Sequence, residues 1–173
     1  MNINDSRFQY AVNVVLEHEG GLSNDKDDKG GITRWGISLR YLELEHIDPN
    51  GDGIIDAHDV RGLTKQEAID IYKAHWWNKY SYNKIKDLRL ATKVFDLAVN
   101  AGAVRAHKLL QQAIGTTVDG LLGPRTIAIT NVQQAGEVLA QLRLEAREFY
   151  LGLIQAKPIY EKYRNGWLAR AAW

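Results

Sequence analysis

Residues 5–38 read DSRFQYAVNVVLEHEGGLSNDKDDKGGITRWGIS, and within them a helical pattern gives way to a glycine-rich acidic loop. At about 100° per residue, Phe8, Val12 and Val15 fall on one apolar stripe of a helix over residues 5–19. A glycine pair follows and is expected to end the helix, because glycine accepts the left-handed conformation found at helix ends. The remaining residues predict a loop or a small hairpin that leads into a short helix over residues 39–46.

The last residue of this first helix, Glu19, lies on the same stripe, within roughly 20° of Phe8, whereas Glu17 points to the opposite side. A carboxyl group at the end of a buried stripe loses hydration, so its pKa rises and it can stay protonated near neutral pH. A general acid that protonates a glycosidic oxygen needs this property. From spacing alone, a glutamate that bends out into solvent is an equal alternative.

The loop after Glu19 supplies a second carboxylate and a hydroxyl. Asp28 precedes a glycine pair that allows a tight turn, and Thr33 follows it. The chain can therefore double back and place both groups across a cleft from Glu19. One carboxyl group would then protonate the leaving oxygen while the ionised one activates water or stabilises an oxocarbenium ion. Asp25 and Asp27 are interpreted as solvated.

Longer motifs carry a family resemblance. EGG, then ND, D-x-GG-x-T and GIS, are followed in order by LTKQEAIDIYKAHWW, VFDLAVNAGAVRAHKLLQQAIG, VDGLLGPRT and YRNGWLAR. This combination resembles the muramidases of glycoside hydrolase family 108, found among phage endolysins, over about residues 10–170. EGG or DGxxGP alone would be weak signals, but their combination and order are specific.

The resemblance implies a mainly α fold: a lysozyme-like orthogonal helical bundle with a small loop or hairpin lobe after the first helix. The family's catalytic glutamate matches Glu19, the aspartate of its D-x-GG pattern matches Asp28, and its threonine matches Thr33. The Glu, Asp and Thr of phage-type lysozymes are similar, with one more residue between the last two. The family usually has proline after each of two loop aspartates, whereas this chain has Lys26 and Lys29, which loosens the loop and weakens the assignment of Asp28.

We expect one globule over residues 1–173, with a catalytic lobe at 1–92 and a helical region resembling the family's peptidoglycan-binding part at 93–173. A capping box of Thr64 and Glu67 opens a helix that reaches about Trp77. Further helices are predicted over residues 91–101, 103–114, 124–132 and 137–156.

A second motif, DPNGDGIIDAHD at residues 48–59, matches a twelve-residue EF-hand loop, with Gly53 at the sharp turn. Its aspartate in place of glutamate at position twelve makes bidentate ligation harder, so we expect a structural Ca²⁺ site of modest affinity and no catalytic cofactor. The alternative is a solvated turn. The expected ligands, at loop positions one, three, five, seven (through its backbone carbonyl), nine and twelve, are Asp48, Asn50, Asp52, Ile54, Asp56 and Asp59.

Composition and charge limit the classes of protein to which the chain can belong. The 173 residues are 45% hydrophobic and contain no cysteine, which suits one compact domain without disulfides or thiolate chemistry. No secretory signal or membrane-length apolar run is visible, so no stable membrane insertion is expected. Residues 1–60 carry a net charge of −7, and residues 61–139 and 140–173 carry +5 and +3. A basic second half suits an anionic polymer, although charge alone does not choose which one.

Aromatic and amide side chains supply the candidate substrate contacts. Tyr72 and Trp76 are candidates for stacking on sugar rings, with a core position as the even alternative. Asn100 is a weaker candidate, because together with Asp96 it is interpreted first as a partner for buried backbone groups. The basic aromatic C-terminus is interpreted as docked on the core, with binding of membrane or cell-wall anions as the alternative.

These observations predict a peptidoglycan hydrolase: an N-acetylmuramidase that cuts the β-1,4 bond between N-acetylmuramic acid and N-acetylglucosamine, as a phage endolysin. A lytic transglycosylase and a non-catalytic, calcium-stabilised peptidoglycan-binding module are the alternatives. The expected partners are bacterial peptidoglycan and a holin-type protein, with no nucleic acid, and the expected state is a monomer. The protein is expected in the host cytoplasm before lysis and then in the periplasm and cell wall.

Overall fold

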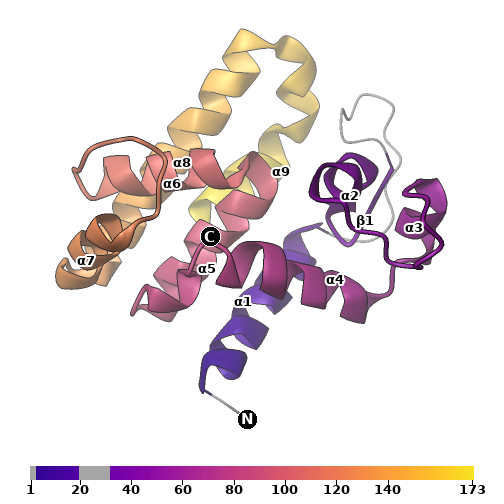
Figure 1. The fold of residues 1–173 in the computed structure, drawn as a ribbon. Coiled ribbons are helices and arrows are strands. Elements are labelled where there is room, and N and C mark those ends of the chain that lie inside the picture. The colour runs from indigo at the N-terminus through magenta and orange to yellow at the C-terminus, as the bar shows by residue number, and fades with distance from the viewer. Residues whose placement is uncertain (1–2, 20–31) are drawn as a thin grey trace.

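The computed structural model describes residues 3–19 and 32–173, and it confirms a mainly helical fold with a small hairpin near its start (Figure 1). The elements in chain order are α1 (Ile3–Glu19), β1 (Thr33–Arg34), β2 (Ile37–Ser38), α2 (Leu39–Glu45), α3 (Ala57–Gly62), α4 (Lys65–Tyr72), the π-helix η1 (Lys73–Asn78), the 3₁₀ turn η2 (Tyr82–Lys84), α5 (Leu88–Ala101), α6 (Ala103–Ala113), α7 (Pro124–Val132), α8 (Ala135–Ala156), the 3₁₀ helix η3 (Pro158–Tyr163) and α9 (Arg164–Ala172).

Helix α5 forms the centre of the molecule. Its residues from Leu90 to Ala98 are all buried, and α1, α6 and α8 pack against it. It begins three residues earlier than the apolar pattern predicts, because the Asp87 side chain accepts a hydrogen bond from Leu90 N at 2.9 Å and caps the helix. The hydrophobic core is continuous from Phe8 to Ala171, so the two halves of the chain share it.

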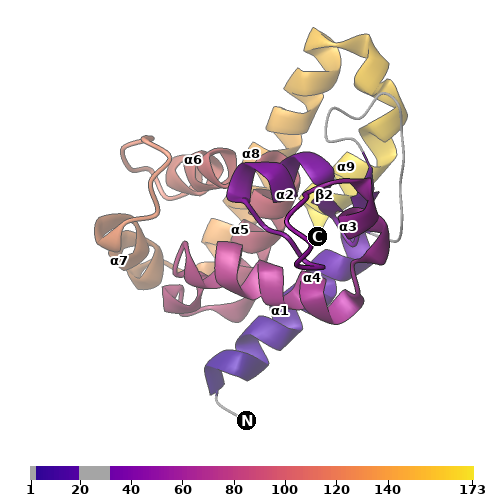
Figure 2. The ribbon, with the colours of Figure 1, turned by 45° about the vertical axis from the view of Figure 1, so that its right-hand side comes forward.

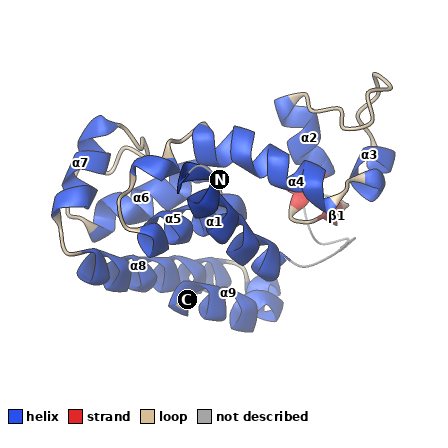
Figure 3. Cartoon of the chain, turned by 90° about the horizontal axis from the view of Figure 1, so that it is seen from below, coloured by secondary structure: helices blue, strands red, loops and turns tan. Residues whose placement is uncertain are grey.

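The other elements lie on either side of this centre. Helices α2 and α3 and the hairpin gather beside α4 at one end, whereas α6 and α7 lie at the other end (Figures 1 and 2). The long helix α8 runs next to α9, which returns antiparallel to it along one face (Figure 3). This return brings the C-terminal residues back towards the end of α1.

Helix α4 begins as its sequence predicts. Thr64 Oγ1 accepts from Glu67 N at 3.2 Å, and Glu67 Oε2 accepts from Thr64 N at 2.7 Å, which confirms the capping box. The predicted continuation to Trp77 is present but changes into the π-helix η1. The wider turn alters the angle between adjacent side chains, and Trp76 and Trp77 are both buried there.

The C-terminal segment after Pro158 forms two elements that the sequence analysis did not predict, η3 and α9. Trp167 stacks between Tyr150 at 5.2 Å and Tyr163 at 5.3 Å, measured between ring centroids. The Lys93 ammonium group donates to the backbone carbonyls of Arg170 and Ala171. Docking of this tail on the core is therefore confirmed.

Within the described part of the chain, none of the helices combines the length and the apolar character that crossing a membrane requires.

Candidate active site

The hairpin formed by β1 and β2 covers the end of α1. Thr33 pairs with Ser38, and the two-residue turn between the strands has positive φ at Trp35 and at Gly36. A Cβ atom at Gly36 would lie 2.6 Å from Glu19 Cγ and 2.3 Å from Tyr72 Oη. The backbone of this turn therefore lies directly against Glu19, which only glycine permits.

Glu19 is the last residue of α1, and it lies on the buried stripe as its spacing predicts. Phe8, Val12 and Val15 are buried along that stripe, whereas Glu17 is exposed on the opposite face. The Glu19 side chain is 16% exposed, so it is mostly shielded and part of it stays accessible to solvent. The equal alternative, a glutamate that bends out into solvent, is wrong.

The charged partner of Glu19 comes from the other end of the chain. Arg170 Nη2, on α9, donates to Glu19 Oε1 at 2.7 Å. The Arg170 side chain is 6% exposed, and its Nε lies 3.7 Å from Asp96 Oδ1 on α5. Asp96 is fully buried and also accepts from His18 Nδ1 at 2.9 Å. Three helices thus contribute to one buried polar cluster, which consists of His18, Glu19, Asp96 and Arg170.

Two polar atoms of this cluster have no hydrogen-bond partner within residues 3–19 and 32–173: Asp96 Oδ2 and Arg170 Nη1. Tyr72 borders the cluster from α4, and its hydroxyl donates to the Trp35 carbonyl at 2.9 Å. The interpretation of Asp96 as a partner for buried backbone groups is wrong, because its carboxylate pairs with two side chains.

Burial determines the protonation of Glu19. Loss of hydration raises the pKa of its carboxyl group, and the nearby Asp96 raises it further, whereas Arg170 and His18 lower it. The net direction is upward from the ordinary value of 4.5. A carboxyl group that keeps its proton closer to neutrality, at the edge of a buried cluster, is able to act as a general acid.

Of the other two predicted catalytic residues, the structure describes Thr33 but not Asp28. Asp28, together with Asp25 and Asp27, lies in residues 20–31, outside the described part. Thr33 begins β1 and is half-buried in the hairpin that covers Glu19. The structure thus places Thr33 and Glu19 in adjoining elements, and the role of Asp28 stays a prediction.

Arg170 is the functional candidate that the sequence analysis missed. It lies 151 positions from Glu19, so no local spacing connects the two residues. The one available signal is that Arg170 ends the motif YRNGWLAR, which carries part of the family resemblance.

The predicted substrate contacts separate into buried and exposed residues. Tyr72 is 0% exposed and Trp76 is 8% exposed, and Trp76 stacks on Tyr41 with ring centroids 4.3 Å apart. Their ring faces are occupied by core neighbours, so the core position, the alternative to sugar stacking, is the one observed. Asn100 is exposed at the end of α5, where its Oδ1 accepts from Tyr150 Oη at 2.8 Å.

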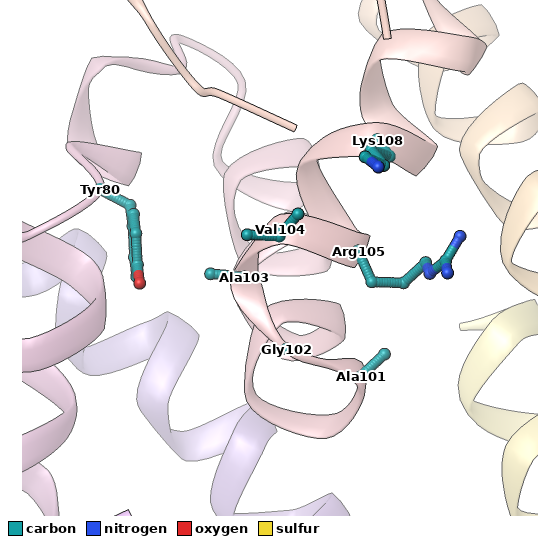
Figure 4. Close-up of a pocket in the computed structure, with 7 residues that line it drawn as sticks. All are labelled: Tyr80, Ala101, Gly102, Ala103, Val104, Arg105 and Lys108. Atoms are coloured by element: carbon teal, nitrogen blue, oxygen red, sulfur yellow. The ribbon is translucent and has the colours of Figure 1, made fainter. Parts of the chain in front are cut away.

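A surface pocket of about 400 Å³ opens where α5 meets α6 (Figure 4). Tyr80 lies across it from Ala103 and Val104, and Arg105 and Lys108 extend from the following turns of α6. Glu19 is not among its lining residues, so this pocket is distinct from the acid site.

The predicted calcium loop has the backbone turns of its motif. Asp48 accepts from Gly51 N and Gly53 N at 2.8 Å each, and Gly53 has φ +86°. Asp56 caps α3, and Asp59 Oδ2 accepts from Asp56 N at 2.8 Å in a reciprocal capping box. The loop residue Ile55 packs against the core.

The acidic side chains of this loop bind its own backbone, and they do not converge on one point. Asn50 accepts from Asp52 N, and Asp52 accepts from Ile54 N, both at 2.8 Å. In the described ranges, no three His, Cys, Asp or Glu side chains come together in a way that would hold a metal ion. Asp59 Oδ1 is buried and has no hydrogen-bond partner there. The order of residues in the loop fits the Ca²⁺-binding motif, but the carboxylates are not arranged as a metal site. Calcium binding therefore stays a prediction.

Two family models match successive parts of the chain. The family model described as Glycosyl hydrolase 108 matches residues 12–102, and the one described as Predicted Peptidoglycan domain matches residues 105–172. No curated protein matches the chain. A solved structure titled Structure of Brucella abortus SagA has 27% sequence identity and a TM-score of 0.80, covering 97% of this chain and 91% of that one.

Proposed function

Because the chain belongs to glycosyl hydrolase family 108 and continues into a peptidoglycan domain, we propose that it is an N-acetylmuramidase. The proposed reaction is hydrolysis of the β-1,4 bond between N-acetylmuramic acid and N-acetylglucosamine in peptidoglycan. The boundary between the two family matches falls in the turn between α5 and α6, whereas the sequence analysis placed it at residues 92 and 93, inside α5.

The environment of Glu19 carries this proposal. Its carboxyl group has a raised pKa, and its side chain stays partly accessible to solvent, so it can deliver a proton to a glycosidic oxygen. The bond between the anomeric carbon and that oxygen breaks as the proton moves, which leaves an oxocarbenium-like centre on the muramic acid ring. Water adds to this centre and passes a proton to the ionised carboxylate proposed for this role, Asp28. Exchange with solvent then removes that proton from Asp28 and restores the acid form of Glu19.

Replacement of the proposed acid tests the mechanism. Glu19→Gln keeps the shape of the side chain and removes the proton donor. We therefore expect a folded protein that binds cell walls and lacks nearly all hydrolytic activity. Turbidity loss of cell-wall suspensions measures the rate, and co-sedimentation with cell walls measures binding. Glu17→Gln, on the exposed face of the same helix, is the matched control. Activity of Glu19→Gln within tenfold of wild type would remove Glu19 from the mechanism.

A lytic transglycosylase is the second candidate, and one observation favours it. Asp96 is the described carboxylate that faces the same arginine as Glu19. Its side chain is fully buried, so water arriving from the surface does not reach it. For hydrolysis, the carboxylate proposed to activate water is Asp28, which lies outside the described residues. Mass spectrometry of the products decides between the two reactions: reducing ends support the muramidase, and 1,6-anhydro ends support the transglycosylase.

The proposed biological role is that of a phage endolysin, and its support is the sequence resemblance to a family found among endolysins. The protein would then reach the cell wall from the cytoplasm after a holin-type partner opens the membrane. Expression without such a partner is expected to leave cells intact until the membrane is permeabilised. Lysis with an intact inner membrane would contradict this role.

A further inference from the structure

The Glu19–Arg170 ion pair joins the glycosyl hydrolase region to the peptidoglycan region. Glu19 lies in the first family match, and Arg170 lies in the second. Their oxygen and nitrogen atoms are 2.7 Å apart, and both side chains are largely shielded from water. A charge-assisted bond of this kind fixes orientation as well as charge.

The guanidinium group of Arg170 is shared between two carboxyl groups. Nη2 binds Glu19, and Nε faces Asp96. Asp96 also binds His18, whereas the only charged hydrogen-bond partner of Glu19 within the described residues is Arg170. Removal of the guanidinium would therefore leave the Glu19 carboxyl without its orienting bond.

Helix α9 is also held in place by contacts that do not involve the Arg170 side chain. Lys93 holds the backbone carbonyls of Arg170 and Ala171, and Arg143 Nε donates to the Trp173 carbonyl at 2.8 Å. Trp167 stacks on Tyr150 of α8. Because these contacts remain when the guanidinium is removed, Arg170 variants are expected to keep α9 docked, and an effect on Glu19 can be measured separately.

We propose that Arg170 is a positioning residue for catalysis, whose guanidinium group holds the Glu19 carboxyl in the orientation for proton transfer and places a positive charge beside it. This inference rests on the proposed role of Glu19 as general acid. It implies that the C-terminal helix of the peptidoglycan region completes the catalytic centre of the hydrolase region.

The direction of the effect follows from the groups that surround Glu19. Among the described residues these are His18 on α1, Tyr72 on α4, Asp96 on α5, Tyr150 on α8 and Arg170 on α9. Arg170 exerts the largest influence that lowers the pKa of Glu19, against burial and Asp96, which raise it. Loss of the guanidinium charge therefore moves the titration of Glu19 to higher pH.

Two variants separate orientation from charge. Arg170→Gln removes the charge. Arg170→Lys keeps the charge but lacks the planar guanidinium group, whose separate nitrogen atoms face Glu19 and Asp96. Arg164→Gln is the matched control, because Arg164 is on the same helix and pairs with Glu161 near the surface. Far-UV circular dichroism and thermal melting establish whether each variant is folded.

Carboxyl ¹³C NMR reads the titration of Glu19 directly and does not require activity. Its resonance is the one that disappears in Glu19→Gln. In Arg170→Gln we expect its titration midpoint at higher pH than in wild type, with no change in Arg164→Gln. An unchanged midpoint in folded Arg170→Gln would overturn the proposal.

The pH–rate profile on soluble peptidoglycan fragments is the second readout. The limb that reports loss of the acid's proton is expected to move to higher pH in Arg170→Gln, and kcat in both variants is expected to fall by up to about 100-fold through misorientation. If Arg170→Gln fails to fold, Arg170→Lys decides: a lower kcat with a wild-type melting curve supports the proposal, and wild-type kcat overturns it. Full activity of Glu19→Gln would instead overturn the proposed function, while the NMR titration still tests the contact.

Discussion

Gly36 and Glu19 are in direct contact, with the turn of the hairpin pressed against the side chain of the proposed acid. A Cβ atom at Gly36 would lie 2.6 Å from Glu19 Cγ, well inside contact distance. The same residue has φ +79°, which L-residues rarely adopt. Conformation and space thus both require glycine at this position, and the hairpin turn is part of the wall of the candidate active site.

Gly36→Ala is expected to lower both stability and activity. The left-handed backbone costs alanine about 1–2 kcal/mol, and forcing a methyl group into packed surroundings costs about 1–3 kcal/mol more. The displaced carboxyl of Glu19 should reduce the hydrolytic rate more than tenfold. Thermal melting and turbidity assays measure the two effects. Gly115→Ala is the control, since Gly115 has φ +66° and nothing within 4 Å of an added Cβ. Equal behaviour of the two variants would contradict the contact.

The stability of the fold should depend on pH through Glu19. Because burial raises the pKa of this carboxyl in the folded protein, its stabilising contribution is fully present below the unfolded value near 4.5 and is lost as pH rises through the folded value. Glu19→Gln cannot ionise and does not undergo this loss. The melting temperature of wild type should therefore fall relative to Glu19→Gln as pH rises above about 4.5. A difference that stays constant from acid to neutral pH would mean that the pKa of Glu19 is not raised.

Asp28 and Thr33 are expected to contribute unequally to the rate. If Asp28 activates or positions water, Asp28→Asn costs about 10²–10⁴ in kcat, the range for general acid–base groups. Thr33→Ala costs less, because a hydroxyl group only orients. Asp27→Asn is the control in the same loop. A larger loss in Asp27→Asn than in Asp28→Asn would show that the carboxylate was assigned to the wrong position.

The predicted calcium loop is tested by thermal melting with Ca²⁺ and with a chelator. If an ion binds the folded state, the melting temperature rises with the logarithm of Ca²⁺ concentration above its dissociation constant. Asp52→Ala should abolish this response, whereas Asp70→Ala, an exposed aspartate on α4, should retain it. Glu19 is not in the loop, so the initial rate at low temperature should change little with chelator. A melting temperature that changes with neither Ca²⁺ nor chelator would show that this stretch is an acidic turn that binds no calcium.

The helical period placed Glu19 on the apolar stripe, but from spacing alone a buried carboxyl and one turned out into solvent were equal alternatives. Contacts from the hairpin and from α9, which the period does not reveal, decided between them. Local chemistry predicted the capping box that opens α4, and before α2 it left a loop and a small hairpin as alternatives, of which the hairpin is observed. The missed elements lack such local signals. Helix α9 is short, and η3 begins at a proline, so their structure depends on packing against α8 and against each other.

The charged environment of Glu19 could not be derived in the same way. Arg170 and Asp96 lie on helices that are far from Glu19 in the sequence, and tertiary packing alone brings them together. For the aromatic residues of α4 and η1, composition suggested sugar contacts equally with core positions. Burial decided this for Tyr72 and Trp76, because each ring has neighbours in the interior.

The enclosure of α5 bears on how such a chain can change by recombination. The helix ends the region matched by the hydrolase family, yet α6 and α8 of the following region cover its buried side chains. A crossover between residues 102 and 105 would exchange those covering helices, together with the arginine that contacts the proposed acid. The two regions are therefore expected to be inherited as a pair. Chimaeras that swap only the peptidoglycan region would have to restore both the packing on α5 and the partner of Glu19.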